Sequence, residues 1–362
     1  MNEAQALLAQ LAEWGGPPLT FMEVCGTHTM AAARAGLRTL LPERVRLISG
    51  PGCPVCVTPV GFIDHALALA QQHDVILATF GDLMRVPGSQ RGGGAAPPSL
   101  QRAKAGGADV RVVYSPLGAL ALARAERERE VVFLGVGFET TTPTVAAAVL
   151  QAAREGLDNF SVLGAHKTIP EAMDALATSD ELRVDGFLCP GHVSVILGPE
   201  VYAPLVEQRG VPCAIAGFET VEILRGLAAM VAQIEAGQPR VDNCYMGAVR
   251  AGGNPKARSI AAQVFTQVDS TWRGLGVIPQ SGLEIAPAYA AHDAARRFQV
   301  ELAAPVEPKG CRCGDVLRGV LDPADCALFG RACTPEAPQG ACMVSSEGSC
   351  AARYHYTEGE GS

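Results

Sequence analysis

The sequence predicts an α/β protein with two doubly wound domains built on parallel sheets, followed by a small Cys-rich domain. Three observations lead to this prediction. Short apolar runs alternate with amphipathic stretches over the first two thirds of the chain, which is typical of parallel strands covered by helices. Glycine (40 residues) and proline (25) are abundant, as tight turns require. Six of the 12 cysteines fall between residues 311 and 350.

Eight short apolar runs have the length of buried strands rather than of helices. They cover residues 19–24, 45–49, 75–80, 110–114, 131–136, 161–165, 186–189 and 213–216. Several lead into a Ser or Thr followed by proline, a start signal for a helix because proline fits the first helical position. These pairs include Thr58-Pro59, Ser115-Pro116 and Thr142-Pro143. Residues 254–266 are predicted as a further helix capped by Asn254.

With 362 residues, the chain is longer than one typical domain. A charged stretch at residues 126–130 is the predicted boundary between two α/β domains, at residues 1–128 and 129–240. Residues 241–362 are the predicted third domain, because Gly, Pro and Cys replace the regular pattern there. Residues 88–98 are predicted as a long loop, which is either a solvated linker between a strand and a helix or a mobile lid or partner-docking loop.

The formal net charge is −8, and no segment is strongly basic. Nucleic acid is therefore not expected as a partner, because such binding requires cations that replace phosphate counterions. The first residues lack the pattern of a secretory signal, and no apolar run approaches the ~20 residues of a membrane span. We therefore expect a cytoplasmic protein without a membrane segment. Thiols stay reduced in that compartment, so the cysteines are expected to be metal ligands or redox groups.

The carboxyl-terminal cysteines give the strongest signal for a metal site. Only Cys311 and Cys313 form a close pair, whereas zinc sites favour paired C-x2-4-C knuckles. Thiolates on separate loops suit a [4Fe–4S] cluster, whose irons face different directions. Such a cluster would also organise a segment that lacks an apolar core. A zinc site and disulfides remain the alternatives.

A second cysteine motif is Gly50-Pro-Gly-Cys53-Pro-Val-Cys56, between a predicted strand and a predicted helix. A C-x-x-C at a helix N-terminus places its first thiol where free N–H groups favour thiolate. The pair is therefore predicted to be a dithiol/disulfide couple or half of a metal site. Two inert cysteines in a turn are the alternative, which is less favoured because flanking Gly and Pro should expose the loop.

Cys25 and His28 form a third candidate site, where a predicted strand ends and a helix begins. Cys and His at this spacing are a weak motif alone. However, reactive groups gather at the carboxyl ends of strands in doubly wound sheets. Cys25, Cys53 and Cys56 all follow predicted strands, so we expect them to share one crevice.

Two further turns carry polar side chains. Residues 135–143 resemble the opening of a dinucleotide fingerprint but lack its third glycine, so a nicotinamide cofactor is not expected. This turn is instead expected to present Glu139 and three hydroxyls to an interdomain cleft. His192, after a predicted strand, is either a site residue or part of a helix-capping turn.

These motifs resemble the HypD family, which helps to build the iron–cyanide–carbonyl unit of [NiFe]-hydrogenases. The matching segments are EVCGTHTM (23–30), SGPGCPVCVTP (49–59), GFETTTP (137–143), CPGHVS (189–194), GFE (217–219), GNPKA (253–257), WRGLGVIPQSGL (272–283) and CMVSSEGSCAA (342–352). They span nearly the whole chain in the expected order. The resemblance implies two α/β domains plus an iron–sulfur domain.

The resemblance also implies roles for individual cysteines. The family holds a [4Fe–4S] cluster with four cysteines separated by 12, 6 and 16 residues, which here are Cys313, Cys326, Cys333 and Cys350. Cys311 and Cys342 are then extra. The iron-site cysteine falls on Cys25, with His28 in a supporting role. The redox-active pair falls on Cys53 and Cys56, for which the cluster is the expected electron source.

The implied function is a scaffold for assembly of the Fe(CN)2CO unit and its delivery to the hydrogenase large subunit. The implied partners are HypC, a small protein that brings its own cysteine to the iron, and HypE, which carries the cyanide donor. Two other functions fit the same residues. One is a stand-alone iron–sulfur thiol oxidoreductase that acts on a small substrate, and the other is a docking platform with a purely structural cluster.

Overall fold

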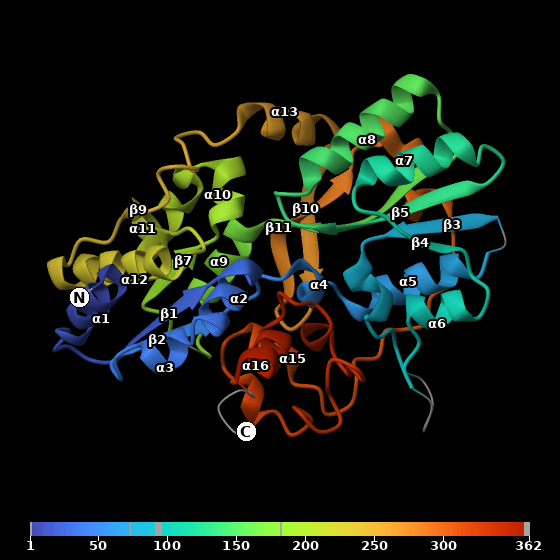
Figure 1. The fold of residues 1–362 in the computed structure, drawn as a ribbon. Helices are drawn as coiled ribbons and strands as arrows, with labels where there is room; N and C mark the ends of the chain where they lie inside the picture. Colours follow the sequence, from blue (N-terminus) through green and yellow to red (C-terminus); the bar gives the residue numbers. More distant parts are fainter. Residues whose placement is uncertain (1, 73, 91–95, 182, 358–362) are drawn as a thin grey trace.

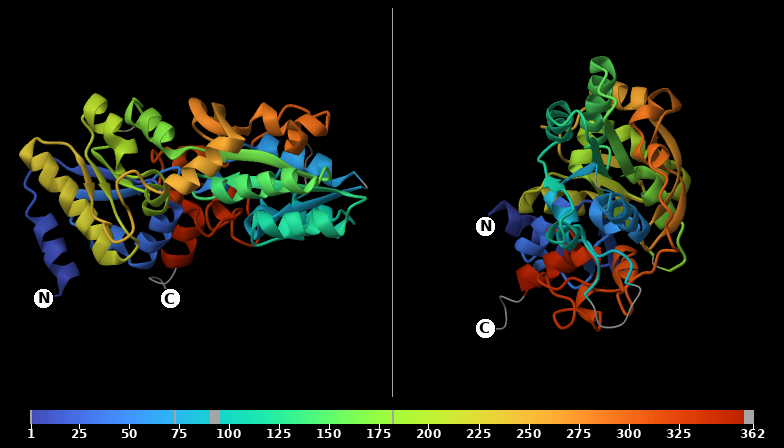
Figure 2. Two further views of the ribbon diagram at one scale, coloured as in Figure 1. Left: turned by 90° about the horizontal axis from the view of Figure 1, so that it is seen from above. Right: turned by 90° about the vertical axis from the view of Figure 1, so that its right-hand side faces the viewer.

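The computed structural model describes residues 2–72, 74–90, 96–181 and 183–357. Two lobes lie side by side, each built on one sheet, and the Cys-rich segment lies below their junction (Figure 1). Seen from above, the molecule is elongated, with the Cys-rich segment against its middle (Figure 2). The predicted α/β class is therefore confirmed. Residues 91–95 of the predicted loop at 88–98 lie outside the described residues.

The first sheet is wholly parallel, with the strand order β2-β1-β7-β8-β9. Its strands are β1 (Leu19–Glu23), β2 (Val45–Ser49), β7 (Gly186–Cys189), β8 (Cys213–Ile215) and β9 (Val241–Asn243). Alternate residues of each strand face opposite layers of helices. One layer consists of α1 (Glu3–Ala12), α2 (Gly26–Arg34), α3 (Leu37–Leu40) and α12 (Thr220–Ala236). The other consists of α9 (Ile169–Ala177), α10 (Gly191–Leu197) and α11 (Ala203–Arg209).

The second sheet has the strand order β10-β11-β6-β5-β3-β4. Its strands are β3 (Val75–Thr79), β4 (Val110–Val112), β5 (Glu130–Gly137), β6 (Phe160–Lys167), β10 (Phe265–Trp272) and β11 (Gly276–Ile285). The last two form an antiparallel hairpin that adds to four parallel strands. The covering helices are α5 (Val60–Ala70) and α6 (Leu100–Ala105) on one face, and α7 (Pro116–Ala125), α8 (Thr142–Glu155) and α13 (Pro255–Val264) on the other.

All eight predicted strands are present, but β9 and the β10–β11 hairpin were not predicted. Pro279 and Gly282 interrupt the apolar pattern of β11, and Gln280 between them has a φ of 53°. Most side chains of β10 are exposed or only partly buried, so the strand lacks the apolar run of a core strand. The predicted helix at 254–266 ends at Val264, because Phe265 already begins β10.

The sheets do not follow the predicted division into residues 1–128 and 129–240. β1 pairs with β7, and β3 pairs with β5, so both sheets contain strands from each side of that boundary. The chain passes between the sheets after β2, after β6 and after β9. Residues 241–285 complete both sheets instead of belonging to a separate Cys-rich domain. Local patterns indicate strands, whereas pairing depends on contacts that are distant in the sequence.

The Cys-rich segment has little regular structure. Its elements are α15 (Cys313–Leu317), α16 (Ser349–Thr357) and the short 3-10 turns Pro323–Asp325 and Ala341–Met343. The remaining short elements of the chain are α4 (Pro54–Val57), α14 (Ala294–Arg297) and the 3-10 turns Gly81–Arg85, Pro199–Tyr202 and Pro287–His292. Leu317, Ala341 and Val344 of the Cys-rich segment join the main core between the lobes. An ion pair of 3.0 Å between Arg38 and Asp322 connects it to the first lobe.

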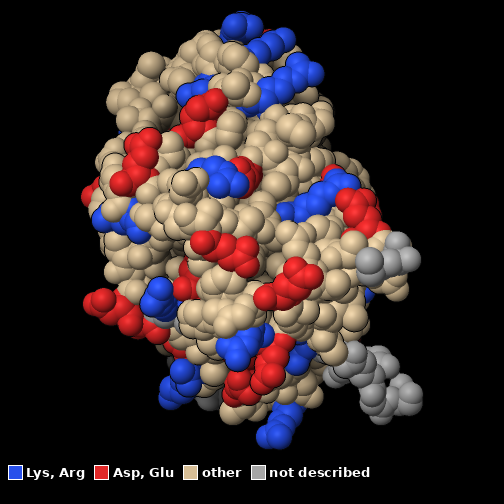
Figure 3. All heavy atoms as spheres, turned by 90° about the vertical axis from the view of Figure 1, so that its left-hand side faces the viewer, with Lys and Arg blue, Asp and Glu red and all other residues tan. Residues whose placement is uncertain are grey.

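Charged side chains of both signs are interspersed on the face of the molecule shown in Figure 3. Exposed ion pairs, such as Arg209 with Asp174 at 2.8 Å, contribute little to stability because water and salt screen them. In the described part of the chain, no helix has both the length and the apolar character needed to cross a bilayer.

Candidate functional site

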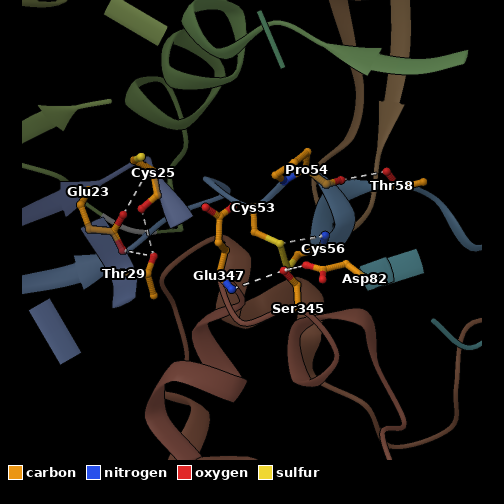
Figure 4. The surroundings of a disulfide bond; sticks show 10 residues. All are labelled: Glu23, Cys25, Thr29, Cys53, Pro54, Cys56, Thr58, Asp82, Ser345 and Glu347. Carbon is orange, nitrogen blue, oxygen red and sulfur yellow. Dashed lines mark hydrogen bonds between the residues drawn. A yellow bond between two sulfur atoms is a disulfide. The ribbon is translucent and has the colours of Figure 1, made fainter. Parts of the chain in front are cut away.

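Cys25 is the N-cap residue of α2 and lies two residues after the end of β1. Its backbone N–H donates a hydrogen bond of 3.0 Å to Oε2 of Glu23. The other carboxylate oxygen of Glu23 accepts a hydrogen bond of 2.6 Å from the Thr29 hydroxyl (Figure 4). Glu23 therefore joins the end of β1 to the first turn of α2 and fixes the position of Cys25.

The loop with Cys53 and Cys56 follows β2 and lies against the Cys25 turn. The N–H of Gly26 donates a hydrogen bond of 2.9 Å to the carbonyl of Gly52. Only a glycine fits at position 52, because a Cβ atom there would lie 2.2 Å from the backbone nitrogen of Cys25. The structure thus brings the two cysteine loops together at the carboxyl ends of neighbouring strands.

Cys53 and Cys56 form a disulfide, with their Cα atoms 5.3 Å apart. Cys53 is the N-cap of α4, and its sulfur accepts a hydrogen bond of 3.2 Å from the Cys56 N–H. Only 3% of Cys53 and none of Cys56 is exposed. The expectation of an exposed loop is therefore wrong, because α15 and the turn Ala341–Met343 pack on α4.

Burial raises the pKa of the Cys25 thiol to about 12, and the carboxylates of Glu23 and Glu347 act in the same direction. The backbone N–H groups of Thr27 and His28 at the start of α2 favour thiolate but do not outweigh burial. A helix N-terminus normally lowers the pKa of a thiol, but at Cys25 the burial of the turn outweighs that effect. A thiolate at this position therefore requires a cation, such as a metal ion, that replaces the proton.

His28 lies in the first turn of α2 and is completely buried. Its Nε2 atom lies 2.9 Å from the Gly217 carbonyl and 3.2 Å from the Ala216 carbonyl, both just after β8. Carbonyls only accept, so Nε2 carries the proton, and Nδ1 has no hydrogen-bond partner among the described residues. Burial lowers the pKa of His28 to about 4. His28 is therefore a neutral side chain that connects α2 to the end of β8.

The Cys-rich segment contacts the start of α2 through Glu347, which was not predicted as a site residue. The Thr27 hydroxyl donates a hydrogen bond of 3.1 Å to Glu347 (Oε1). Gly26 allows this contact, because a Cβ atom there would lie 2.4 Å from the Glu347 Cβ. The Ser345 hydroxyl donates to Asp82 of the second lobe over 2.9 Å (Figure 4). Residues 345–347 therefore link both lobes at the cysteine loops.

All six carboxyl-terminal cysteines line one small cavity, namely Cys311, Cys313, Cys326, Cys333, Cys342 and Cys350. They come from separate turns and from the first turns of α15 and α16. Sulfur is the donor that an iron–sulfur cluster requires, so the chemistry of this cavity fits such a group. In the described residues, no group of three or more His, Cys, Asp or Glu side chains is placed to hold a metal ion. The cavity does not separate the four predicted ligands from Cys311 and Cys342.

Arg273 lies between the two cysteine sites and was also not predicted. Its backbone N–H donates a hydrogen bond of 2.8 Å to Val57, at the end of α4. Its side chain is 4% exposed, and its Nε atom lies 3.4 Å from the Glu307 carboxylate. Hydrogen bonds from neighbouring thiols, and then the charge of Arg273, lower the pKa of Cys313. The buried guanidinium therefore offsets negative charge in the six-cysteine cavity.

Glu139 follows β5 and is almost completely buried. Its Oε1 accepts a hydrogen bond of 2.9 Å from the Ile169 N–H at the start of α9, and burial raises its pKa to about 8. The hydroxyls of Thr141 and Thr142 bond to carbonyls of their own turn. Of the three threonines, Thr142 alone lines the cavity beside Glu139, and its hydroxyl is bonded within the turn, so the expectation of three hydroxyls directed into a cleft is wrong.

His192 lies in the first turn of α10, and its ring packs against Phe218 with 4.2 Å between the ring centroids. Phe218 also contacts His28, at 4.9 Å between centroids. Cys189 and Cys213 are completely buried on neighbouring strands. The His192 and Phe218 rings therefore pack beside His28, whereas Cys189 and Cys213 lie in the core of the first lobe.

The fold and the site thus define the class of this protein. It is an α/β protein of two lobes, with a buried thiol site where the lobes meet and a cavity lined by six cysteines next to that site. A family model described as "HypD: Hydrogenase formation hypA family" matches residues 2–357. The hydrogenase maturation factor HypD of Azotobacter vinelandii is 47% identical over 98% of this chain and 94% of its own. Those of Rhizobium leguminosarum bv. viciae and Escherichia coli K12 are 48% and 45% identical over 93% and 95% of this chain, and over 88% and 90% of their own. The chain belongs to the HypD family of hydrogenase maturation factors, as its motifs predict.

Proposed function

We propose that this protein is the scaffold on which one iron ion acquires cyanide and carbon monoxide ligands during hydrogenase maturation. The observation that supports the proposal best is the Cys25 turn. The Cys25 thiol there is buried and has a raised pKa. It follows β1, and the loop with Cys53 and Cys56, which follows the neighbouring strand β2, lies against it. Membership of the HypD family gives the process in which the site acts. The iron unit is cargo that the protein receives and releases.

In this proposal, Cys25 is the protein's ligand to the iron. Low-spin iron with cyanide and carbonyl ligands favours a soft, electron-donating thiolate. Iron binding replaces the proton that burial otherwise keeps on the sulfur. One thiolate leaves iron positions open for a cysteine of the small partner HypC and for cyanide delivered through HypE. His28 supports the Cys25 turn, and the finished Fe(CN)2CO unit passes to the hydrogenase large subunit.

A [4Fe–4S] cluster would be held by Cys313, Cys326, Cys333 and Cys350 in the six-cysteine cavity. When bound, it supplies electrons one at a time. The Cys53–Cys56 disulfide takes up two electrons and two protons when it becomes a dithiol.

The burial of the Cys53 and Cys56 sulfurs argues against a function as a stand-alone thiol oxidoreductase, because a free substrate would need access to one of these sulfurs.

The test of the scaffold is infrared spectroscopy of the protein co-purified with its small partner without oxygen. Cyanide and carbonyl stretching bands should accompany iron in the complex and be missing from either protein expressed alone. Iron without these bands would contradict the proposal. Turnover of a small disulfide substrate by the purified protein alone would favour the oxidoreductase instead.

The cluster assignment predicts different results for two cysteines of the same cavity. Cys333→Ala should abolish the visible absorbance of the cluster and its bound iron and sulfide. Cys342→Ala should keep both, because the family spacing leaves Cys342 out of the ligand set. Absorbance, iron and sulfide content and electron paramagnetic resonance measure the difference. Loss of the cluster from Cys342→Ala but not from Cys333→Ala would show that the ligand set is different.

The redox couple predicts that Cys53 and Cys56 resist alkylation in the oxidised protein, even after denaturation. Reduction should make both available in the unfolded protein, while labelling of the reduced native protein should be slow because both sulfurs are buried. Mass spectrometry of the peptide measures the labelling, and the partly exposed Cys244 is the internal control. Full labelling of the pair in oxidised, unfolded protein would contradict the redox role and favour a role as metal ligands.

A further inference from the structure

A second cavity lies between the lobes and has no part in the proposed iron chemistry. Its walls come from α8, α9, α10, α13 and the β10–β11 hairpin. Figure 1 shows α8, α10 and α13 on the opposite side of the molecule from the Cys-rich segment. The cavity volume of about 510 Å³ is in the range of sites for small molecules.

Three oxygen atoms of the lining residues have no hydrogen-bond partner among the described residues. They are Oε2 of Glu139, Oε2 of Glu171 and Oγ1 of Thr168. Glu139 is 5% exposed and Thr168 is 8% exposed, so these groups are largely removed from solvent. Buried polar atoms are normally paired, and each unpaired one costs about 1–3 kcal/mol. Each of these three oxygen atoms can accept a hydrogen bond from a ligand, and the Thr168 hydroxyl can also donate one.

The protein uses only one oxygen of each carboxylate. Oε1 of Glu139 accepts from the Ile169 N–H over 2.9 Å, and Oε1 of Glu171 accepts from the Gln267 amide over 2.9 Å. Arg258 is the one cationic side chain among the described lining residues, and it donates to the Gly252 carbonyl. The two remaining carboxylate oxygens are thus available to a ligand with N–H groups.

The rest of the wall is apolar, with Ile196, Leu197, Val201, Phe265 and Leu283 facing the cavity. A ligand must therefore combine an apolar body with a polar end that donates hydrogen bonds. A positive charge on that end matches the carboxylates, because a nearby cation favours the ionised form that burial of Glu139 disfavours.

We propose that this interlobe cavity binds a small organic cation, an amidinium or ammonium group on an apolar body, through Glu139 and Glu171. The site goes beyond the scaffold function and involves no cysteine. Since α10 packs on the first sheet and β11 belongs to the second, a bound ligand would contact both lobes.

The test uses benzamidine and cyclohexylammonium as probes, with benzoate as the matched anion, on the purified full-length protein. Isothermal titration calorimetry and thermal unfolding should detect both cations and should not detect benzoate. Binding of the cations should weaken by about tenfold or more in Glu139→Gln and Glu171→Gln, since each loses a charged hydrogen-bond acceptor. Glu128→Gln, on the exposed surface, is the control and should bind like the wild type.

Glu139 also caps α9, so circular dichroism must show that its variant is folded. Ala262→Trp narrows the cavity without altering either carboxylate, and it should also weaken cation binding. Equal binding of benzoate and benzamidine, or unchanged binding in all three cavity variants, would overturn the proposal. Failure of both cations to bind would mean that the cavity holds water only, and would also overturn it. None of these measurements requires iron or a partner, so the scaffold function stands or fails separately.

Discussion

Gly52→Ala should destabilise the protein by about 3 kcal/mol, because it places a methyl group into backbone atoms that cannot move aside. The new Cβ atom would lie 2.2 Å from the Cys25 nitrogen and 2.5 Å from its Cα atom. To relieve this contact, the C-x-x-C loop must move away from the Cys25 turn. The hydrogen bond between the Gly26 N–H and the Gly52 carbonyl would then break.

Urea denaturation, followed by circular dichroism, measures this loss of stability as a lower midpoint. Gly247→Ala is the matched control, because no atom lies within 4 Å of a Cβ at that position, and the midpoint should hardly change. An equal, small effect of both substitutions would show that the two cysteine loops are not held together as closely as the structure indicates. A large loss for Gly52→Ala alone would support a rigid thiol site.

The strands could be predicted from the sequence because each core strand is a local apolar run. The pairing of β1 with β7 and of β3 with β5 could not, since these strands carry the same kind of pattern and their order depends on distant contacts. The β10–β11 hairpin was missed for a different reason. Its strands are largely exposed, and Pro279 interrupts the second one, so local propensity argued against a strand.

The position of the thiol site was predictable, but its electrostatics were not. Strand ends place Cys25 beside the C-x-x-C loop, as expected for a parallel sheet. The raised pKa of Cys25 arises from burial and from Glu23 and Glu347, and Glu347 comes from a segment more than 300 residues away. The position of Cys25 at the start of a helix, taken by itself, would indicate a reactive thiolate. In this fold, burial instead favours the protonated thiol, which agrees with the proposed role of Cys25 as a ligand that loses its proton when iron binds.

Cys25→Ser should abolish the cyanide and carbonyl infrared bands of the protein expressed with its small partner. Serine nearly preserves the size of the side chain, so the packing against Glu23 and Glu347 should survive and the protein should remain folded. Oxygen is a hard donor and a serine hydroxyl is far harder to deprotonate than a thiol, so the variant should not retain low-spin iron. The six-cysteine cavity is unchanged, and any cluster absorbance should therefore stay at the wild-type level.

Cys244→Ser is the matched control, because Cys244 follows β9 outside both cysteine sites, and its bands should be those of the wild type. Cys25→Ala should give the same loss as Cys25→Ser, which separates the need for sulfur from any effect of the serine hydroxyl. If the bands persisted in both Cys25 variants, another group would hold the iron, and the scaffold mechanism would be wrong at its central residue. If the bands and the cluster absorbance disappeared together, Cys25 would be needed for the fold rather than for the iron. Loss of the bands alone is the result expected of a direct ligand.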